Sequence, residues 1–340
     1  NVTGVDPIAA FPTQVNSGSC AQAVGASGYI ESSCAFFAGL SPQQPSVVPL
    51  GGGYAGAAIA TTTACSMGQL AIQVIAPSAG GNTQSDDCAS GSALPSIAPL
   101  PDGESALVTW YETPLSTRGD SLQSCAGASA APLVAAVVSG ATSASPTLGK
   151  PVTLTSAGVS VRAAAMAALP GLSQVLVAAP DGDAVSVWAL DASLSASSPV
   201  SVPGLAGARA VSMAVATDGS GRVALAAEIG CTPQTIALVG GTLSGGFSEA
   251  IVVAGANGAA AVQPTVAWVA SEGDWVVAWI SADGGAHVLA QRFDAGGVAR
   301  GGVIDPSTPA TGASVDGDGS LLEYVPASNS FVKASLGCAE

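Results

Sequence analysis

Residues 264–297 decide the fold: PTVAWVASEGDWVVAWISADGGAHVLAQRFDAGG. Three runs rich in β-branched and aromatic residues lie here between glycine-containing turns: 265–269, 275–280 and 287–293. A further turn then leads into a fourth short run near Val303 and Ile304. The pattern predicts one antiparallel sheet of four strands.

The same order of runs and turns recurs along the chain. The turn glycine before the second run marks each copy: Gly53, Gly103, Gly171, Gly221, Gly273 and Gly319. Intervals of about 50 residues suit a four-stranded propeller blade. We therefore predict an all-β fold, a β-propeller of four-stranded antiparallel blades that forms a single domain over residues 1–340. A β-sandwich or β-solenoid with irregular strands is the alternative.

The number of blades is predicted as seven with the first abbreviated, or six. The N-terminal sequence Gly4-Val5-Asp6-Pro7 is similar to part of residues 302–306, which we expect to form an outer strand. An N-terminal strand at the outer edge of the last blade would close the ring and remove an exposed edge.

The blade at 264–297 also carries a family resemblance. The segments GDWVVAW at 273–279 and AQRFDAGG at 290–297 resemble a repeat of large bacterial secreted β-propeller proteins. The resemblance implies the propeller fold and an extracytoplasmic setting. It implies no catalytic residues, because the positions that the repeat shares are structural.

Composition excludes several classes of function. The chain has 23 acidic and 8 basic residues, a net charge of −15 and only 9% charged residues. Binding to nucleic acid or to an anionic membrane surface is therefore not expected. Mean hydropathy is +0.50, yet no uninterrupted run of large apolar residues is long enough for a transmembrane helix. The chain begins at Asn1, which fits removal of a signal peptide, so we expect a secreted, periplasmic or cell-surface protein.

The seven cysteines point to disulfides in an oxidising compartment. No Cys-x-x-Cys pair occurs and there is one histidine, so a zinc site is not expected. The candidate pairs are Cys20 with Cys34, across a predicted hairpin, and Cys65 with Cys88. Cys125 is the candidate for a free or intermolecular thiol, with a bond to Cys231 or Cys338 as the alternative.

The interval between Gly103 and Gly171 contains an insertion at 112–132, between the second and third strands of one blade. Its charged residues Glu112, Arg118 and Asp120 form a candidate binding site, because loops on a rigid scaffold often carry function. A solvated loop with an internal ion pair is the alternative.

Carboxylates around glycines at Asp316, Asp318 and Glu323 form a candidate calcium site. The alternative is a strand-connecting turn, as at Asp102-Gly103 and Asp218-Gly219, where Asp-Gly tolerates positive φ. No other cofactor is expected.

No catalytic residue stands out. The only histidine is His287, and the sequence contains no G-x-S-x-G motif that would supply a nucleophile beside it. The arginines are too scattered along the chain to form the cluster with which sialidases bind the carboxylate of their substrate. We therefore predict a non-catalytic exported propeller that acts as a binding or assembly module of a surface, envelope or extracellular complex, through protein partners or self-assembly. The alternative is a carbohydrate-active propeller, lectin or glycosidase, using carboxylates such as Glu104, Glu112 or Asp120. A carboxylate pair in the central funnel would favour a glycosidase, and an uncharged funnel would exclude it.

Overall fold

The computed structural model describes residues 8–15, 18–23, 42–50, 53–60, 68–76, 79–84, 91–113, 130–141, 143, 145–158, 163–169, 171–195, 198–231, 234–255, 260–281, 286–306, 312–315, 317–325 and 330–335. Every regular element in these ranges is a β-strand, as the sequence predicted. Within the same ranges no helix is long and apolar enough to cross a membrane.

The described strands form seven antiparallel sheets that follow one another in chain order. The first three sheets contain β1 Ile8–Val15 and β2 Gly18–Ala23; β3 Pro42–Leu50, β4 Gly53–Ala60, β5 Gln69–Ala76 and β6 Ala79–Gln84; β7 Ala93–Pro99, β8 Ala106–Tyr111, β9 Ala131–Ser139, β10 Thr147–Leu148 and β11 Val152–Gly158. The fourth and fifth contain β12 Ala165–Ala168, β13 Val175–Asp181, β14 Ala184–Leu190 and β15 Val200–Val202; β16 Ala208–Val215, β17 Arg222–Ile229, β18 Thr235–Thr242, β19 Gly246–Phe247 and β20 Ile251–Ala254. The last two contain β21 Ala261–Val269, β22 Asp274–Ser281, β23 His287–Asp294 and β24 Ala299–Ile304; β25 Gly312–Val315, β26 Ser320–Val325 and β27 Ser330–Ser335.

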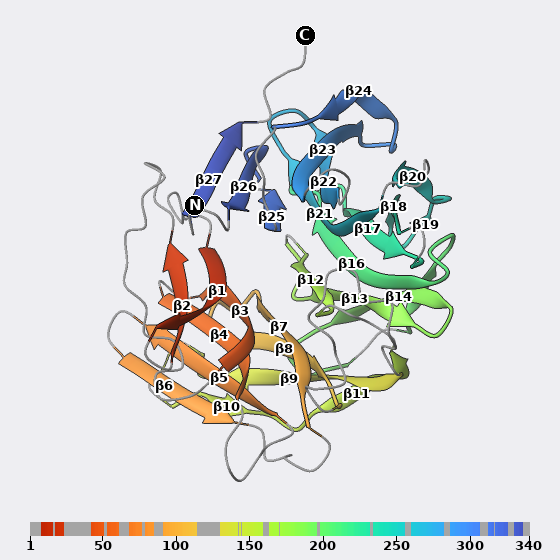
Figure 1. The fold of residues 1–340 in the computed structure, drawn as a ribbon. Helices are drawn as coiled ribbons and strands as arrows, with labels where there is room; N and C mark the ends of the chain where they lie inside the picture. The colour runs from red at the N-terminus through yellow and green to blue at the C-terminus, as the bar shows by residue number, and fades with distance from the viewer. Residues whose placement is uncertain are drawn as a thin grey trace.

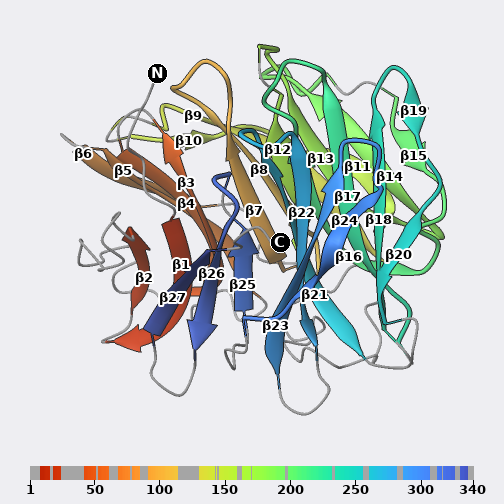
Figure 2. The same cartoon turned by 90° about the horizontal axis from the view of Figure 1, so that it is seen from above.

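The sheets are arranged around a common centre, from β1 in red to β27 in blue (Figure 1). The first strand of each sheet lies innermost, and consecutive first strands contact one another from β1 through β3, β7, β12, β16 and β21 to β25. The view from above shows neighbouring sheets lying side by side around the molecule (Figure 2). Each sheet is open, and no closed sheet occurs in the described residues.

Five apolar clusters hold consecutive sheets together. One cluster packs the sheet of β3–β6 against that of β7–β11, and the next packs β7–β11 against β12–β15. The other three join the following sheets in the same way up to β25–β27. Alanine and valine are the commonest residues in these clusters. Their small side chains let neighbouring sheets pack closely, so a chain with 48% hydrophobic residues can bury most of them between its sheets.

The sheet of β21–β24 confirms the four strands predicted from residues 264–304. The marker glycines also lie where the sequence placed them, in the connections between first and second strands or, for Gly53, at the first residue of the second strand. Five of them have positive φ: Gly103, Gly171, Gly221, Gly273 and Gly319. A side chain in this left-handed conformation is strained, which is why glycine recurs there.

An aspartate one residue before a glycine stabilises three of these turns. Asp102 Oδ1 accepts hydrogen bonds from the Glu104 and Ser105 amides. Asp218 Oδ1 accepts one from Ser220 N at 2.9 Å, and Asp318 Oδ1 accepts one from Ser320 N at 2.8 Å. The repeated geometry is that of an Asx turn, so these aspartates have a structural role.

The charge of Asp218 makes one of these turns sensitive to pH. The Ser220 hydroxyl and amide, together with the Arg222 guanidinium, lower the pKa of Asp218 from 3.8 to about 2. A carboxyl with a lowered pKa stabilises the fold above its unfolded pKa, and this stabilisation is lost as the pH falls through its folded pKa. It is therefore present at pH 7 and lost between about pH 4 and 2.

We expect Asp218→Asn to lower the free energy of unfolding slightly at pH 7, because the exposed ion pair with Arg222 is lost. The difference from the parent protein should shrink in high salt and vanish near pH 2. Urea unfolding at pH 7, 4 and 2 measures this, with the exposed Asp183→Asn as the control. A difference that persists unchanged at pH 2 would mean that the carboxylate charge is not responsible.

Candidate functional site

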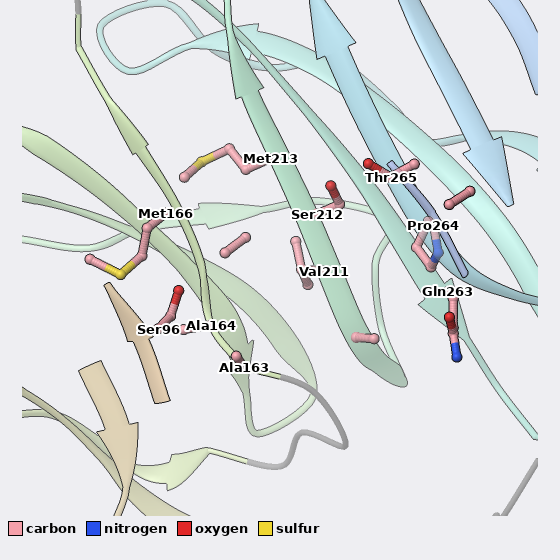
Figure 3. Close-up of a pocket in the computed structure, with 13 residues that line it drawn as sticks. Ser96, Ala163, Ala164, Met166, Val211, Ser212, Met213, Gln263, Pro264 and Thr265 are labelled. Carbon is pink, nitrogen blue, oxygen red and sulfur yellow. The ribbon is translucent and has the colours of Figure 1, made fainter. Parts of the chain in front are cut away.

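A cavity of about 410 Å³ lies where the first strands of five sheets converge. Its described lining comes from β7, the start of β12, β16, β21 and β25, as the sticks in Figure 3 show. The lining residues are Ser96, Ala163, Ala164, Ala165, Met166, Ala210, Val211, Ser212, Met213, Gln263, Pro264, Thr265 and Ala313. Because these residues come from strands about 50 residues apart, the cavity exists only in the assembled fold.

The described lining is uncharged. Three hydroxyls, from Ser96, Ser212 and Thr265, and the Gln263 amide are its polar side-chain groups, and the remaining surface is aliphatic or thioether. Such a mixture of apolar surface and a few convergent polar groups is typical of small-molecule sites. It can hydrogen-bond a neutral polar ligand, but it offers neither an acid–base pair nor a cationic clamp.

Bulges at proline shape the first strands that line the cavity. In β7 the pairing register shifts between Ala93 and Ser96, and in β21 it shifts between Val262 and Thr265. The residue before the proline has positive φ in both strands, +53° at Leu94 and +54° at Gln263. For a non-glycine residue this conformation costs about 1–2 kcal/mol, so the surrounding structure must stabilise it.

A buried carboxylate stabilises the second of these bulges. Glu228 in β17 is 2% exposed, and its Oε2 accepts a hydrogen bond of 3.1 Å from Gln263 N. Its Oε1 accepts one of 3.2 Å from Gln234 Nε2. The Gln234 carbonyl in turn accepts a bond from Ala261 N. Glu228 therefore connects the sheet of β16–β20 to β21 directly behind the cavity wall.

Hydroxyl groups provide further links between neighbouring first strands. Ser212 Oγ accepts a hydrogen bond of 3.1 Å from Val266 N in the next sheet. Ser46 Oγ accepts one of 3.3 Å from Ile97 N in an equivalent arrangement. These bonds fix the spacing of the strands around the centre, so the shape of the cavity is set by the backbone.

The predicted insertion site lies mostly outside the described residues, which exclude Arg118 and Asp120. Glu112 is half-buried at the end of β8, where its amide donates to the Pro132 carbonyl. Tyr111 pairs with Ala93, the first residue of β7, so the β8–β9 connection leaves from the end of the sheet where β7 begins. The binding role of this loop stays a prediction.

Glu104 and Glu112 cannot act together as a glycosidase pair. Glu104 is exposed in the turn before β8, and Glu112 follows the last residue of β8. Six extended residues separate them, which corresponds to about 20 Å. A glycosidase needs carboxyls about 5–10 Å apart.

The candidate calcium residues differ in environment. Asp318 is exposed, and its Oδ2 forms an ion pair of 3.0 Å with Lys333 Nζ. Glu323 is fully buried within β26, opposite Ala313, and Asp316 lies outside the described residues. No cluster of three or more potential metal ligands occurs in the described part of the chain. A calcium site at these residues stays a prediction.

The predicted disulfide pairs cannot be compared with the structure, because Cys34, Cys65, Cys88 and Cys125 lie outside the described residues. Cys20 lies in β2 opposite Phe11. Cys231, which follows β17, is disulfide-bonded. The pairings Cys20–Cys34 and Cys65–Cys88 stay predictions.

Most described arginines are engaged in ion pairs away from the cavity. Arg222 pairs with Asp218, Arg292 with Glu272, and Arg300 with Asp274 at 3.0 Å. Burial raises the pKa of Asp274, which the Arg300 charge opposes. The five tryptophans are each at most 5% exposed, which confirms that they pack between sheets: Trp110, Trp188, Trp268, Trp275 and Trp279.

The cavity residues were not recognised from the sequence as a site. A signal is nevertheless present, since proline followed by a hydroxyl residue recurs in three first strands, at Pro45-Ser46, Pro95-Ser96 and Pro264-Thr265. In each of these strands the proline lies in the bulge, and the hydroxyl residue is the first residue paired after it. Glu228 gives no such signal, because a glutamate near the end of a strand is ordinarily solvated.

No protein-family model matches the chain, and no curated protein matches it. Solved structures with the same fold include the BP39L lectin from Burkholderia pseudomallei, with a TM-score of 0.54, 15% identity and coverage of 88% of this chain and 85% of that one. The NanB sialidase from Streptococcus pneumoniae gives a TM-score of 0.52 at 10% identity and covers 88% and 70%. A protein of unknown function from Dyadobacter fermentans gives 0.50 at 14% identity and covers 86% and 93%.

These likenesses agree with the arrangement of the sheets around a centre. The chain has a β-propeller fold, and its described antiparallel sheets have two to five strands, three of them four.

Proposed function

We propose that this propeller is a carbohydrate-binding protein that binds a neutral glycan in the central cavity and does not hydrolyse it. The single observation that carries the proposal is that the described lining at the centre of the propeller is uncharged and bears hydroxyl groups. The likeness to a propeller lectin supports the choice of ligand class. The comparisons support a carbohydrate-active propeller, the alternative from the sequence, better than the assembly role. The choice of the lectin form rests on the described lining of the cavity.

Two features argue against hydrolysis of the bound glycan. The buried carboxylates Glu228 and Glu323 belong to second strands, opposite the cavity residues Ala210 and Ala313, and are not part of the described lining. Among the described residues, the lining therefore offers no pair of carboxyls for acid–base catalysis. A sialidase, by contrast, would need cations for the sugar carboxylate, and the described lining has none.

A glycan array of neutral and sialylated oligosaccharides tests the proposal, with product analysis of each bound glycan. We expect binding to a restricted set of neutral glycans and no released sugar. Release of sugar would favour a glycosidase, and preference for sialylated glycans would contradict an uncharged site. Absence of binding to any glycan would contradict the proposal that the protein binds carbohydrate.

Thr265→Val is expected to weaken neutral-glycan binding by about five- to tenfold while the fold is retained. The substitution keeps the branched shape and removes one hydroxyl from the cavity wall, and one hydrogen bond contributes about 0.5–1.5 kcal/mol. Titration with the best glycan from the array measures the change. Thr147→Val, at an exposed position in β10, is the matched control and should leave affinity unchanged. Equal loss in both variants would exclude a specific role for Thr265.

The finer architecture belongs to the same proposal. Seven blades with an abbreviated first blade agree with the order of the seven described sheets, of which the first has two strands and the last three. The N-terminal strand predicted around Gly4–Pro7, which would lie at the outer edge of the last blade, falls outside the described residues and stays a proposal. The low fraction of charged residues and the disulfide-bonded Cys231 fit an exported protein, which would bind its glycan outside the cytoplasm.

One observation remains in favour of an assembly role. Apolar side chains are exposed on or beside the outer strands β20 and β24: Ile251, Val252, Val298 and Val303. Exposed apolar surface of this kind can mark a protein contact. The native mass of the isolated protein, measured with and without reductant, distinguishes an assembly from a monomer of 32.5 kDa.

A further inference from the structure

The wall of the cavity contains a residue whose conformation is held from behind. Gln263 has a φ of +54°, precedes Pro264 and lies in the bulge of β21. Its amide cannot take a regular place in the ladder, because the register shifts between Val262 and Thr265. A buried amide without a partner is costly, so this conformation depends on the acceptor that the fold provides.

We infer that Glu228 is a positioning residue for glycan binding: it fixes the Gln263 bulge and thereby sets the shape of the cavity, without touching the glycan. This deepens the proposed function and rests on it only for the nature of the ligand. The geometry behind it is a 2% exposed carboxylate with Oε2 at 3.1 Å from Gln263 N. Glu228 belongs to β17 and Gln263 to β21, so the bond crosses from one sheet to the next.

The second oxygen of Glu228 makes a separate hydrogen bond. Oε1 accepts from Gln234 Nε2 at 3.2 Å, and Gln234 is itself 3% exposed. Ala210, which lies opposite Glu228 in β16, lines the cavity, as do Val211 and Ser212 beside it (Figure 3). A change at Glu228 therefore reaches two of the strands that form the wall.

Isosteric substitutions separate positioning from packing. Glu228→Met keeps the volume and removes both acceptor oxygens. Glu228→Gln keeps one acceptor for Gln263 N and an amide that can donate to a rotated Gln234 side chain, so it can rescue the bond without the charge. Gln234→Met removes the neighbouring bond and leaves the acceptor for Gln263 intact, which makes it the matched control.

Amide hydrogen exchange of Gln263, followed by NMR on the full chain, tests the inference without any ligand. We expect Glu228→Met to speed exchange at Gln263 by about tenfold or more, as for loss of one hydrogen bond of roughly 1.4 kcal/mol. Exchange in Glu228→Gln and Gln234→Met should stay within about twofold of the parent protein. Unchanged exchange in Glu228→Met, or equal acceleration in all three variants, would overturn the inference.

The same variants on the glycan array connect this conformation to binding. Glu228→Met should weaken neutral-glycan binding by about tenfold or alter which glycans are bound, and Glu228→Gln should restore the parent profile. If Glu228→Met does not fold, Glu228→Asp withdraws both oxygens while keeping the charge, and the same changes are expected. A parent protein that binds no glycan would contradict the proposed function, whereas the exchange result would still decide whether Glu228 positions Gln263.

Discussion

Trp275→Ala is expected to destabilise the protein by about 3–5 kcal/mol, the range for removal of a buried tryptophan. Trp275 is 1% exposed in the middle of the cluster that joins the sheets of β16–β20 and β21–β24. Its ring meets that of Trp268 edge-on, with centroids 4.7 Å apart and an interplanar angle of 61°. Arg222 from the preceding sheet lies 4.8 Å from the Trp268 centroid, so the cavity left by Trp275 would also loosen this contact.

Urea unfolding of the variant and the parent protein measures the loss. The control is Leu172→Ala, since Leu172 is 55% exposed and its removal should change stability by no more than about 0.5 kcal/mol. A loss below about 1.5 kcal/mol for Trp275→Ala would mean that the two sheets are held together elsewhere. Such a result would also contradict the conclusion that the tryptophans are structural.

The strands of the propeller were predictable because their signals are local. In β22 each residue is buried, and the run from Trp275 to Ile280 is unbroken by polar residues. The preceding glycine, Gly273, must adopt a positive φ, which leaves a mark in the sequence. The same two signals recur about every 50 residues, so the repeat could be recognised even where the residues differ.

The candidate site was not predictable because its parts are far apart and chemically plain. Ala164, Ala210 and Ala313 line the cavity, and alanine carries no signal of a binding site. Glu228 becomes significant only when β21 brings the Gln263 amide within 3.1 Å of its carboxylate. Sequence reasoning instead favoured the charged insertion, because charge is conspicuous in a chain with 9% charged residues.

Gly255→Ala is expected to destabilise the protein by about 2–5 kcal/mol, which is large for the addition of one methyl group. Gly255 follows β20 with a φ of +86°, and a Cβ there would lie 2.4 Å from the Gln234 carbonyl oxygen and 2.8 Å from Thr235 Cα. Both contacts are with backbone atoms of β18 or the residue before it, so no side-chain rotation relieves them. Left-handed strain adds about 1–2 kcal/mol and overpacking about 1–3 kcal/mol.

Gly219→Ala is the matched control that separates these two contributions. Gly219 has a similar φ of +78°, and a Cβ there would meet no atom within 4 Å. Its loss of stability in urea unfolding should therefore reflect left-handed strain alone, about 1–2 kcal/mol. The excess loss of stability for Gly255→Ala then measures how tightly β20 packs against β18, next to Gln234, which donates to Glu228. Equal losses in the two variants would show that β20 can move away from β18 without further cost in stability.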